Sequence, residues 1–509
     1  MLHDLLSDDV SAIRTGDRRL DRRCQQVMAA FMAGPGRSIP ETMVTDAATE
    51  GLYRALRNER VTAERLIGPH RSGTWQRALF AAARPSDGER PPASTKASDF
   101  SRQSDDIGGF IVALHDTTDL TYRGEKPRSG LPHDGEKSRL YMHASALVCE
   151  GEQGELLGIV HHDLYAVAEG CWIPLDSESC TWDKELIVGS ERWQESVRTV
   201  ASACPPGRPV VHVMDREADD YGLWNVVLEF GHDMVVRGCV SRRTKQPDGA
   251  APRVTQLRDG LSQVVCREVY LSRRSGGRPP ATRSTHPDRE TRSAKLEIGV
   301  GSAVFVRPDG YPLGWRSEIS LNILHVTEKE PPDGVEPVDW LLYTTLPVES
   351  AGDALRVVDL YRRRWLIEEF FKALKTGCAA EELQLESAQT LKKMLAILIP
   401  SAWRLMALRT LSRDERDLPA SQVLDEVELA VLRTQPAGKS LPAAPTIKQV
   451  TLAIARLGGL LRQNGAPGWA VLHRGLQVLI GLSEGWRLAV QALGLDRSST
   501  ARPGGRPKL

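Results

Sequence analysis

Apolar positions recur at helical spacing near the N-terminus of the chain. One face of a predicted helix is formed by Leu20, Cys24, Val27, Met28, Phe31 and Met32. A second helix is predicted around residues 50–58, and residues 85–106, rich in Pro, Ser, Asp and Gly, indicate a linker or exposed loop. We therefore expect a helical domain over residues 1–84.

The pattern then changes to short, continuous apolar runs. Residues 109–116 and 209–215 are two such runs, and each ends in an aspartate. Residues 141–149 and 156–161 have the same character. Buried strands with helical segments between them are typical of a mixed α/β sheet that is covered on both faces.

Short β patterns dominate residues 234–345, and helical spacing resumes at Ser350. The β stretch interrupts the α/β pattern. We therefore expect an all-β insertion at about residues 234–345, inside an α/β domain that covers residues 85–412. Residues 413–497 are predicted to form a helical domain, and the basic tail at 498–509 is expected to be disordered.

A polar stripe marks one predicted helix at residues 361–375. At about 100° per residue, four of its side chains point within roughly 60° of one another. They are Tyr361, Arg364, Glu368 and Lys375. Apolar residues occupy the adjoining arc, so the helix can pack one side and present the other. A carboxylate beside a guanidinium, a phenol and an ammonium suits a site for a metal ion and phosphates.

Composition is that of a soluble globular protein, with 41% hydrophobic and 26% charged residues among 509. No apolar run reaches membrane-spanning length, and the acidic N-terminus lacks the basic segment of a secretory signal. The eight cysteines form no C-x-x-C pair, which favours reduced thiols over disulfides or a zinc site. We therefore expect a cytoplasmic protein without a membrane segment.

Charge is balanced overall but unevenly distributed. The 66 basic and 66 acidic side chains cancel, whereas residues 241–295 hold 13 Lys or Arg against 5 Asp or Glu. Arginines also crowd the two N-terminal helices, at Arg18, Arg19, Arg22, Arg23, Arg54 and Arg57. Local basic stretches are what the neutralisation of nucleic-acid phosphates requires, although solvated helix faces show the same pattern.

Three acidic residues form a candidate carboxylate triad: Asp116, Asp215 and Glu368. Three acids brought together repel one another and protonate unless a cation compensates. Mg²⁺ suits such a set because it prefers hard oxygen ligands, a few carboxylates and substrate phosphate. Two such ions would stabilise the attacking and leaving oxygens in phosphodiester displacement. A single Asp at a strand end is more often a turn residue or a helix cap.

The residues of the stripe and the triad resemble a known family. A Y-(2)-R-(3)-E-(6)-K signature of that family is met by Tyr361, Arg364, Glu368 and Lys375. Residues 115–118 and 215–219 resemble its first and second catalytic Asp segments, and residues 340–350 resemble a third segment. From about residue 16 to 486 the chain resembles the IS-four group of bacterial cut-and-paste DDE transposases, which includes the Tn-five transposase.

The resemblance implies an α/β, RNase H-like catalytic core of the retroviral integrase superfamily, with the β insertion inside it. An N-terminal helical DNA-binding domain and a C-terminal helical dimerisation domain would flank this core. The catalytic residues, which would also bind Mg²⁺ or Mn²⁺, would be Asp116, Asp215 and Glu368. Phosphates of the transposon-end DNA would be held by Tyr361, Arg364 and Lys375.

Two further residues are assigned through the resemblance. Composition alone favours a buried strand tryptophan at Trp340, but its place 21 residues before Tyr361, in a matching segment, favours stacking on a base flipped out of the transposon end. Arg237 would lie near the active site, although an ordinary charge at a strand end is the simpler interpretation.

The expected function is to cut transposon ends and join them to target DNA by metal-dependent hydrolysis and transesterification. The partners would be the terminal inverted repeats, the target DNA and a second subunit in the synaptic complex. One alternative is a catalytically silent, transposase-derived protein that only binds DNA or inhibits. Another is a glycosidase with paired carboxylates, which explains the acids but not Arg364, Lys375 and the basic insertion.

Overall fold

The computed structural model describes residues 9–82, 111–149, 156–168, 171–175, 190–245, 250–271, 290, 292–411, 417–461 and 467–493. The chain divides into two compact units. The sheet unit comprises Thr74–Thr121 and Gly130–Glu369, and the helical unit comprises Met1–Gly73, Tyr122–Ser129 and Phe370–Leu509. The linker predicted at 85–106 and the tail predicted at 498–509 lie outside the described residues.

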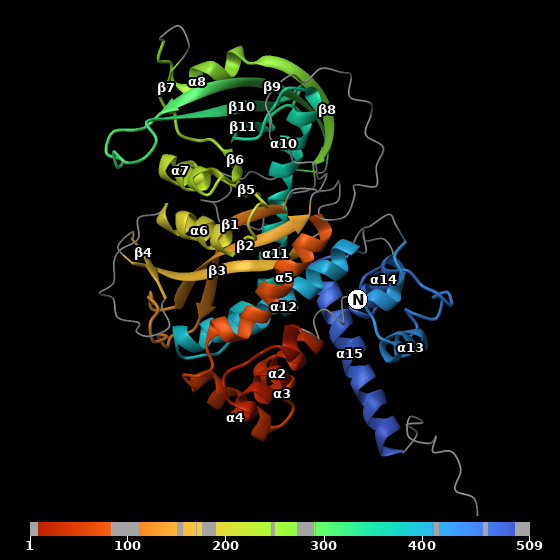
Figure 1. Ribbon diagram of the computed structural model, residues 1–509. Helices are drawn as coiled ribbons and strands as arrows, with labels where there is room; N and C mark the ends of the chain where they lie inside the picture. The colour runs from red at the N-terminus through yellow and green to blue at the C-terminus, as the bar shows by residue number, and fades with distance from the viewer. Residues whose placement is uncertain are drawn as a thin grey trace, which may run out of the picture. The chain divides into compact units, whose positions relative to one another are not determined.

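One mixed sheet contains all the strands of the described chain (Figure 1). The strands are β1 (Ile111–Arg123), β2 (Lys137–Cys149), β3 (Leu156–Ala168), β4 (Cys171–Pro174), β5 (Val210–Met214), β6 (Asp233–Arg237), β7 (Thr244–Lys245), β8 (Ser262–Leu271), β9 (Arg292–Val306), β10 (Glu318–Lys329) and β11 (Asp339–Thr344). Their order is β4-β3-β2-β1-β5-β6-β11-β10-β9-β7, and β8 pairs with β9. The mixed α/β architecture expected from the sequence is confirmed.

The centre of the sheet combines two kinds of pairing. β2 and β3 are antiparallel, whereas β1, β5 and β6 are parallel neighbours. The helical segments in this part of the chain are α6 (Glu191–Ala203), η1 (Arg216–Ala218) and α7 (Tyr221–Glu229). Parallel pairing needs such crossovers, and strands covered on both faces read as continuous apolar runs. β5 fits this rule, because all five of its residues are buried.

The strand that carries Asp116 is longer than predicted. We expected it to end at Asp116, but β1 continues to Arg123. Its pairing with β5 extends only over Ile111–Leu114, and beyond that level its neighbour in the sheet is β2. The continuation has threonines and a tyrosine, which favour strands, and it buries Leu120 and Tyr122 completely. Asp116 therefore lies within a strand, at the point where its parallel neighbour ends.

The predicted β insertion continues the central sheet. β6 belongs to the parallel core, because Val211–Met214 of β5 pair with Asp233–Val236. β11 then pairs antiparallel with β6, so the later strands extend the same sheet. The stretch also contains two helical turns, α8 (Val254–Leu257) and η2 (Arg258–Gly260). The expectation of an all-β segment starting at residue 234 was therefore wrong, since an apolar β pattern does not reveal its partner strand.

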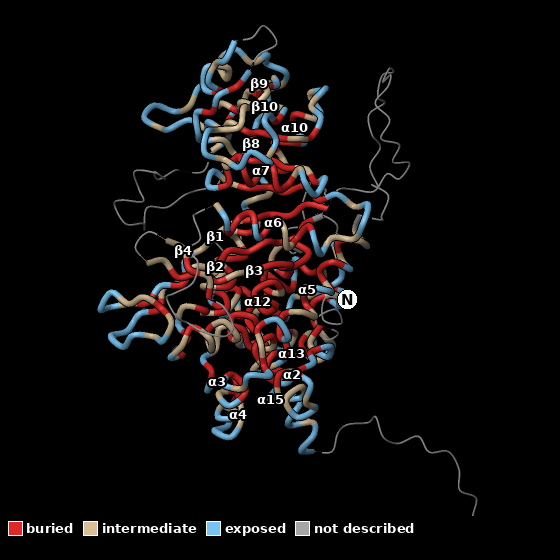
Figure 2. Tube along the Cα trace, turned by 60° about the vertical axis from the view of Figure 1, so that its left-hand side comes forward, coloured by how far each residue is buried: buried red, intermediate tan, exposed pale blue. Residues whose placement is uncertain are grey.

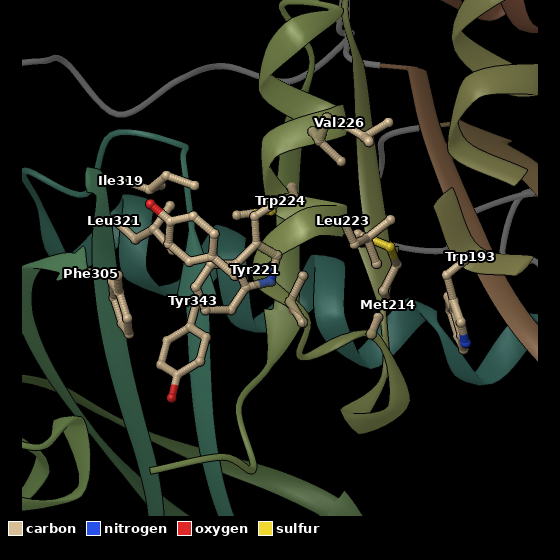
Figure 3. Close-up of a cluster of buried hydrophobic side chains, with 14 of the residues drawn as sticks. Trp193, Met214, Tyr221, Leu223, Trp224, Val226, Phe305, Ile319, Leu321 and Tyr343 are labelled. Carbon is tan, nitrogen blue, oxygen red and sulfur yellow. The ribbon is translucent and has the colours of Figure 1, made fainter. Parts of the chain in front are cut away.

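A single hydrophobic cluster joins the central strands to the insertion (Figure 3). It contains Trp193 of α6, Trp224 of α7, Met214 of β5, Phe305 of β9 and Tyr343 of β11, all at most 1% exposed. Trp224 meets Phe305 and Tyr343 edge-on, at ring distances of 5.3 and 5.5 Å. The insertion is therefore packed into the core of the sheet unit.

Helices make up most of the helical unit. They are α2 (Arg18–Ala33), α3 (Ile39–Met43), α4 (Asp46–Arg57), α5 (Ala63–Ala82, which runs into the sheet unit), η3 (Ala373–Gly377), η4 (Ala380–Glu382), α12 (Ala388–Leu411), η5 (Ala420–Gln422), α13 (Glu426–Thr434), α14 (Ile447–Leu457) and α15 (Trp469–Ala492). The predicted apolar face of α2 is buried from Cys24 to Met32. Among the described helices, none has the length and apolar character needed to cross a membrane.

Helix α12 organises the N-terminal helices through two cationic side chains. Nη1 of Arg404 donates to the carbonyl of Met32 at 3.0 Å, near the C-terminal end of α2. Nζ of Lys393 donates to the carbonyls of Leu56 and Asn58, at the end of α4. Cations are favoured at helix C-termini, where carbonyl groups lack partners within the helix. Figure 2 shows α12 as largely buried, so the N- and C-terminal helices share one core.

Two glycines allow α14 and α15 to cross at very short distance. A Cβ atom on Gly475 would lie 1.7 Å from the carbonyl oxygen of Ile454. A Cβ atom on Gly458 would lie 1.8 Å from the carbonyl oxygen of Val471. Both obstacles are backbone atoms, which no change of rotamer can move away.

Gly475→Ala should destabilise the protein, because the new methyl group forces the two helices apart. The cost of overpacking predicts a loss of about 1–3 kcal/mol or more in the free energy of unfolding. The matched control is Gly485→Ala on the same helix, where a Cβ would have no described atom within 4 Å. Higher helix propensity should stabilise this control by up to about 1 kcal/mol. Equal melting temperatures for the two variants would contradict the close crossing.

Candidate active site

The pairing of β1 with β5 brings two of the predicted carboxylates to one level. Ile111 pairs with Val210 and Leu114 with Val213, a constant offset of 99 residues. Continued by two residues, the same offset places Asp116 opposite Asp215. Neighbouring strands lie about 4.8 Å apart, and paired residues of parallel strands share a face. The register therefore brings the two aspartates to the same level, just beyond the last paired residues.

Each aspartate is oriented by a backbone N–H group close to it in sequence. The N–H of Thr117 donates to Oδ1 of Asp116 at 2.8 Å. The N–H of Glu217 donates to Oδ1 of Asp215 at 2.8 Å, so Asp215 caps the short helix η1. The capping role that we weighed against a functional one for Asp215 is therefore real. Both roles are compatible, because the second oxygen of the carboxylate takes no part in the cap.

The predicted helix at 361–375 is not continuous. α10 (Ala351–Arg363) and α11 (Trp365–Lys372) meet at Arg364. There the N–H groups of Arg364 and Ile367 bond to carbonyls three residues back, both at 3.1 Å, in place of the usual four. The projection at a uniform 100° per residue was therefore wrong across this turn. Neither Pro nor Gly occurs in residues 361–372 to signal it.

Arg364 links the strand carboxylate to the helix carboxylate. Its Nη1 donates to Oδ2 of Asp116 at 2.6 Å, and its Nη2 donates to Oε1 of Glu368 at 2.6 Å. The three side chains are only 15%, 14% and 28% exposed. Hydrogen bonds between ionised partners are short and strong, particularly where water is scarce. Carboxylates from β1 and α11 are thus held by one guanidinium.

The electrostatics place all three carboxylates in one site. Burial raises the pKa of Asp116 from its ordinary value of 3.8 to about 7. The charges of Asp215 and Glu368 also raise it, while Arg364 acts in the opposite direction. Burial acts to lower the pKa of Arg364, but the charges of Asp116 and Glu368 outweigh burial and raise it. The site therefore carries more negative charge than one guanidinium neutralises.

The donor chemistry fits a hard divalent cation. Carboxylate oxygens are the ligands that Mg²⁺ and Mn²⁺ prefer, and burial together with the charges of Asp215 and Glu368 raises the pKa of Asp116. Within the described residues, no three acidic, His or Cys side chains already stand in metal-ligating positions. Instead, the guanidinium of Arg364 supplies the positive charge between Asp116 and Glu368.

Tyr361 and Trp340 lie in contact with each other. Tyr361 is only 6% exposed, and its ring meets that of Trp340 edge-on, with centroids 5.3 Å apart. Trp340 lies on β11 opposite Val326 of β10 and is partly exposed. A fully buried strand tryptophan is therefore not what the structure shows. Base stacking by Trp340 stays a prediction, as does phosphate binding by Tyr361.

Arg237 lies one strand beyond Asp215. The register of β5 with β6 has an offset of 22, since Val211 pairs with Asp233, and its continuation places Arg237 opposite Asp215. Nη2 of Arg237 donates to the carbonyl of Asp339 at 3.0 Å. Lys375 belongs to the helical unit, within the π-helical turn η3, so its part in the site stays a prediction.

Two residues near the carboxylates escaped the sequence analysis. Arg192 lies in the first turn of α6, is only 3% exposed and bonds to Glu217. Asp219 accepts N–H groups of Cys239 and Val240, each at 2.7 Å, and anchors the loop after β6. Arg192 gave no signal, because an arginine in a first helical turn looks like a solvated charge. Asp219 was visible only as the last acid of the segment 215–219.

Most N-terminal arginines are exposed. Arg18, Arg19 and Arg22 are exposed on α2, and Arg54 and Arg57 are exposed on α4. Arg54 is engaged with Glu50 at 2.9 Å. The side chains on α2 present the positive charge that DNA phosphates attract.

Comparison with protein families connects these features. Residues 3–61 match the family model described as Transposase DNA-binding, which includes α2 and α4 with their exposed arginines. Residues 194–402 match the family model described as Transposase DDE domain, which includes Asp215 and Glu368. Asp116 precedes this second match. The match to a transposase DNA-binding region, followed along the chain by the match to a transposase DDE domain, supports a DDE transposase.

Proposed function

We propose that this protein is a DNA transposase that cuts transposon ends and joins them to target DNA. The observation that carries the proposal is that Arg364 bridges Asp116 and Glu368, with the charge of Asp215 acting on the same groups. The strand order β3-β2-β1-β5-β6, with β5 and β6 parallel to β1, supports an RNase H-like core. The signature around Tyr361 supports membership of the IS-four group.

The chemistry requires positioning and neutralisation of charge more than covalent catalysis. A bound divalent ion would activate water and neutralise charge on the scissile phosphate. Asp116, Asp215 and Glu368 would hold the ion. Water cuts one strand at the transposon end, and the freed 3′-OH attacks the opposite strand to form a hairpin. After the hairpin is reopened, the 3′-OH attacks a target phosphodiester.

The basic residues of the site would hold the DNA. The fork of Arg364 matches a phosphate as well as a carboxylate, so an incoming DNA phosphate competes for the guanidinium that now binds Asp116 and Glu368. Lys375 would supply a point charge and Tyr361 a hydroxyl to the same backbone. These exchanges leave the carboxylates available to the ion.

Purified protein should nick an oligonucleotide that carries the terminal inverted repeat when Mg²⁺ is added. Asp116→Ala should lower nicking at least about 100-fold, which is the scale of losing one electrostatic contributor to catalysis. It should still shift the oligonucleotide in a gel, because the DNA-binding region is intact. Asp119→Ala, at an exposed residue on the same strand, is the matched control and should nick normally.

Three outcomes of this assay would count against the proposal. Binding without nicking by the wild type would favour the silent DNA-binding alternative. Nicking that survives Asp116→Ala would remove Asp116 from the site. Failure to bind DNA together with hydrolysis of a glycoside would favour a glycosidase.

Stabilisation by Mg²⁺ should depend on pH. Without metal, the folded protein keeps the Asp116 proton up to about pH 7, whereas the unfolded chain loses it near 3.8. This group therefore reduces stability as pH rises through that window, because the unfolded state binds fewer protons. A metal ion displaces the proton, so Mg²⁺ should raise the melting temperature more at pH 8 than at pH 5. Asp116→Asn should lose most of the increment at pH 8. Equal increments at both pH values would contradict the assignment.

A homodimer is the assembly that we propose for the synaptic complex. Val478, Leu482 and Trp486 on α15 are 43%, 41% and 52% exposed. Their spacing of four residues aligns them along one side of the helix. An exposed apolar stripe marks a surface for a protein partner, and two DNA ends held together require two copies of the chain.

Charge on this stripe should separate the subunits. Leu482→Glu with Trp486→Glu should convert the DNA-bound dimer to a monomer, measured as mass by light scattering, because two carboxylates would be buried at the contact. Leu488→Glu is the control, since Leu488 is 66% exposed but lies on another side of the helix. A dimer that persists in the double variant would place the interface elsewhere.

A further inference from the structure

We infer that Arg192 is a positioning residue that fixes Asp116 and Asp215 relative to each other. The inference rests on the proposed function, in which these two carboxylates hold a divalent ion together. Arg192 itself is only 3% exposed, so it acts through its neighbours and does not touch DNA.

Arg192 contacts one residue that orients Asp116 and one residue that orients Asp215. Its Nε lies 3.5 Å from the hydroxyl of Thr117, and its Nη2 donates to Oε2 of Glu217. Thr117 and Glu217 are also the two residues whose backbone N–H groups hold Oδ1 of Asp116 and of Asp215, each at 2.8 Å. One guanidinium thus connects the two residues that orient the two carboxylates.

Each of these two residues has a further restraint. The hydroxyl of Thr117 also pairs with Nδ1 of His143 at 2.9 Å, so it is fixed from β2 as well. Glu217 lies in the short helix η1, which Asp215 itself caps. The side chain of Glu217 is 58% exposed, and its bond to Arg192 adds a polar link between this turn and α6.

The buried position of Arg192 at the start of a helix costs free energy of folding. It lies in the first turn of α6, where the helix dipole disfavours a cation. Burial lowers its pKa, and the charge of Glu217 opposes that effect. The ring of Trp172 supports the guanidinium at 3.9 Å. An apolar side chain could not make the contacts to Thr117 and Glu217.

The test is the affinity of full-length protein for Mn²⁺ without DNA, measured from the electron paramagnetic resonance of free Mn²⁺. Arg192→Lys keeps the charge but loses the fork. Glu217→Gln removes the ionic partner on the exposed side. Arg198→Gln, also on α6 and bonded to Gln194 within the helix, is the matched control. Asp116→Ala reports whether Mn²⁺ binds at the proposed site.

Both Arg192→Lys and Glu217→Gln should raise the dissociation constant for Mn²⁺ about 10–100-fold, the usual effect of losing a group that orients metal ligands. Nicking should recover toward the wild-type rate at saturating Mn²⁺, and Arg198→Gln should match the wild type. The double variant should be no weaker than the weaker single variant, because both changes break one connection.

Wild-type affinity in folded Arg192→Lys and Glu217→Gln proteins, with affinity lost in Asp116→Ala, would overturn the inference and leave the proposed function intact. If Arg192→Lys does not fold, Glu217→Gln decides alone. If the wild type neither nicks DNA nor binds Mn²⁺ in a way that depends on Asp116, the proposed function fails and the inference falls with it.

Discussion

Parallel pairing of β1 with β5 is the constraint on which the site depends. Continued by two residues beyond the last pair, its constant offset of 99 residues brings Asp116 level with Asp215. Pairing of β5 with β6 continues the same row to Arg237. The fold thus brings two acids together, and the charge of Asp215 acts to raise the pKa of Asp116. Other features of the site reduce the repulsion between these carboxylates.

Arg364 supplies positive charge that reduces the repulsion between the carboxylates. The guanidinium binds Asp116 and Glu368 at once and holds the helix carboxylate beside the strand carboxylates. Yet burial, with the charges of Asp215 and Glu368, keeps the pKa of Asp116 raised despite Arg364. The carboxylates can bind a divalent ion, and the guanidinium of Arg364 can bind a DNA phosphate instead of a carboxylate. The site is therefore suited to divalent ions and DNA together. The ion-pair geometry and the transposase family matches therefore support the same function.

How much could be predicted depended on whether a feature is local in sequence. The runs before Asp116 and Asp215 indicated buried strands because each is short, apolar and continuous. The length of β1, the partner of β6 and the turn at Arg364 could not be predicted, because each depends on packing between distant segments. Arg192 shows the same limit. Its charge suggested solvent, whereas Trp172 and Glu217, distant in sequence, hold it in the interior.

The continuity of the sheet has a consequence for how the protein folds. β1 meets β5 only after about a hundred further residues, and β6 meets β11 after a similar span. At about 5–20 residues per second of synthesis, each of these two spans takes roughly 5–20 s to complete. During that time the edge of β1 that will receive β5, and the edge of β6 that will receive β11, have no partner strand. Exposed edges of this kind recruit other chains. The same long-range pairing that assembles the carboxylates therefore makes the growing chain a natural client for chaperones.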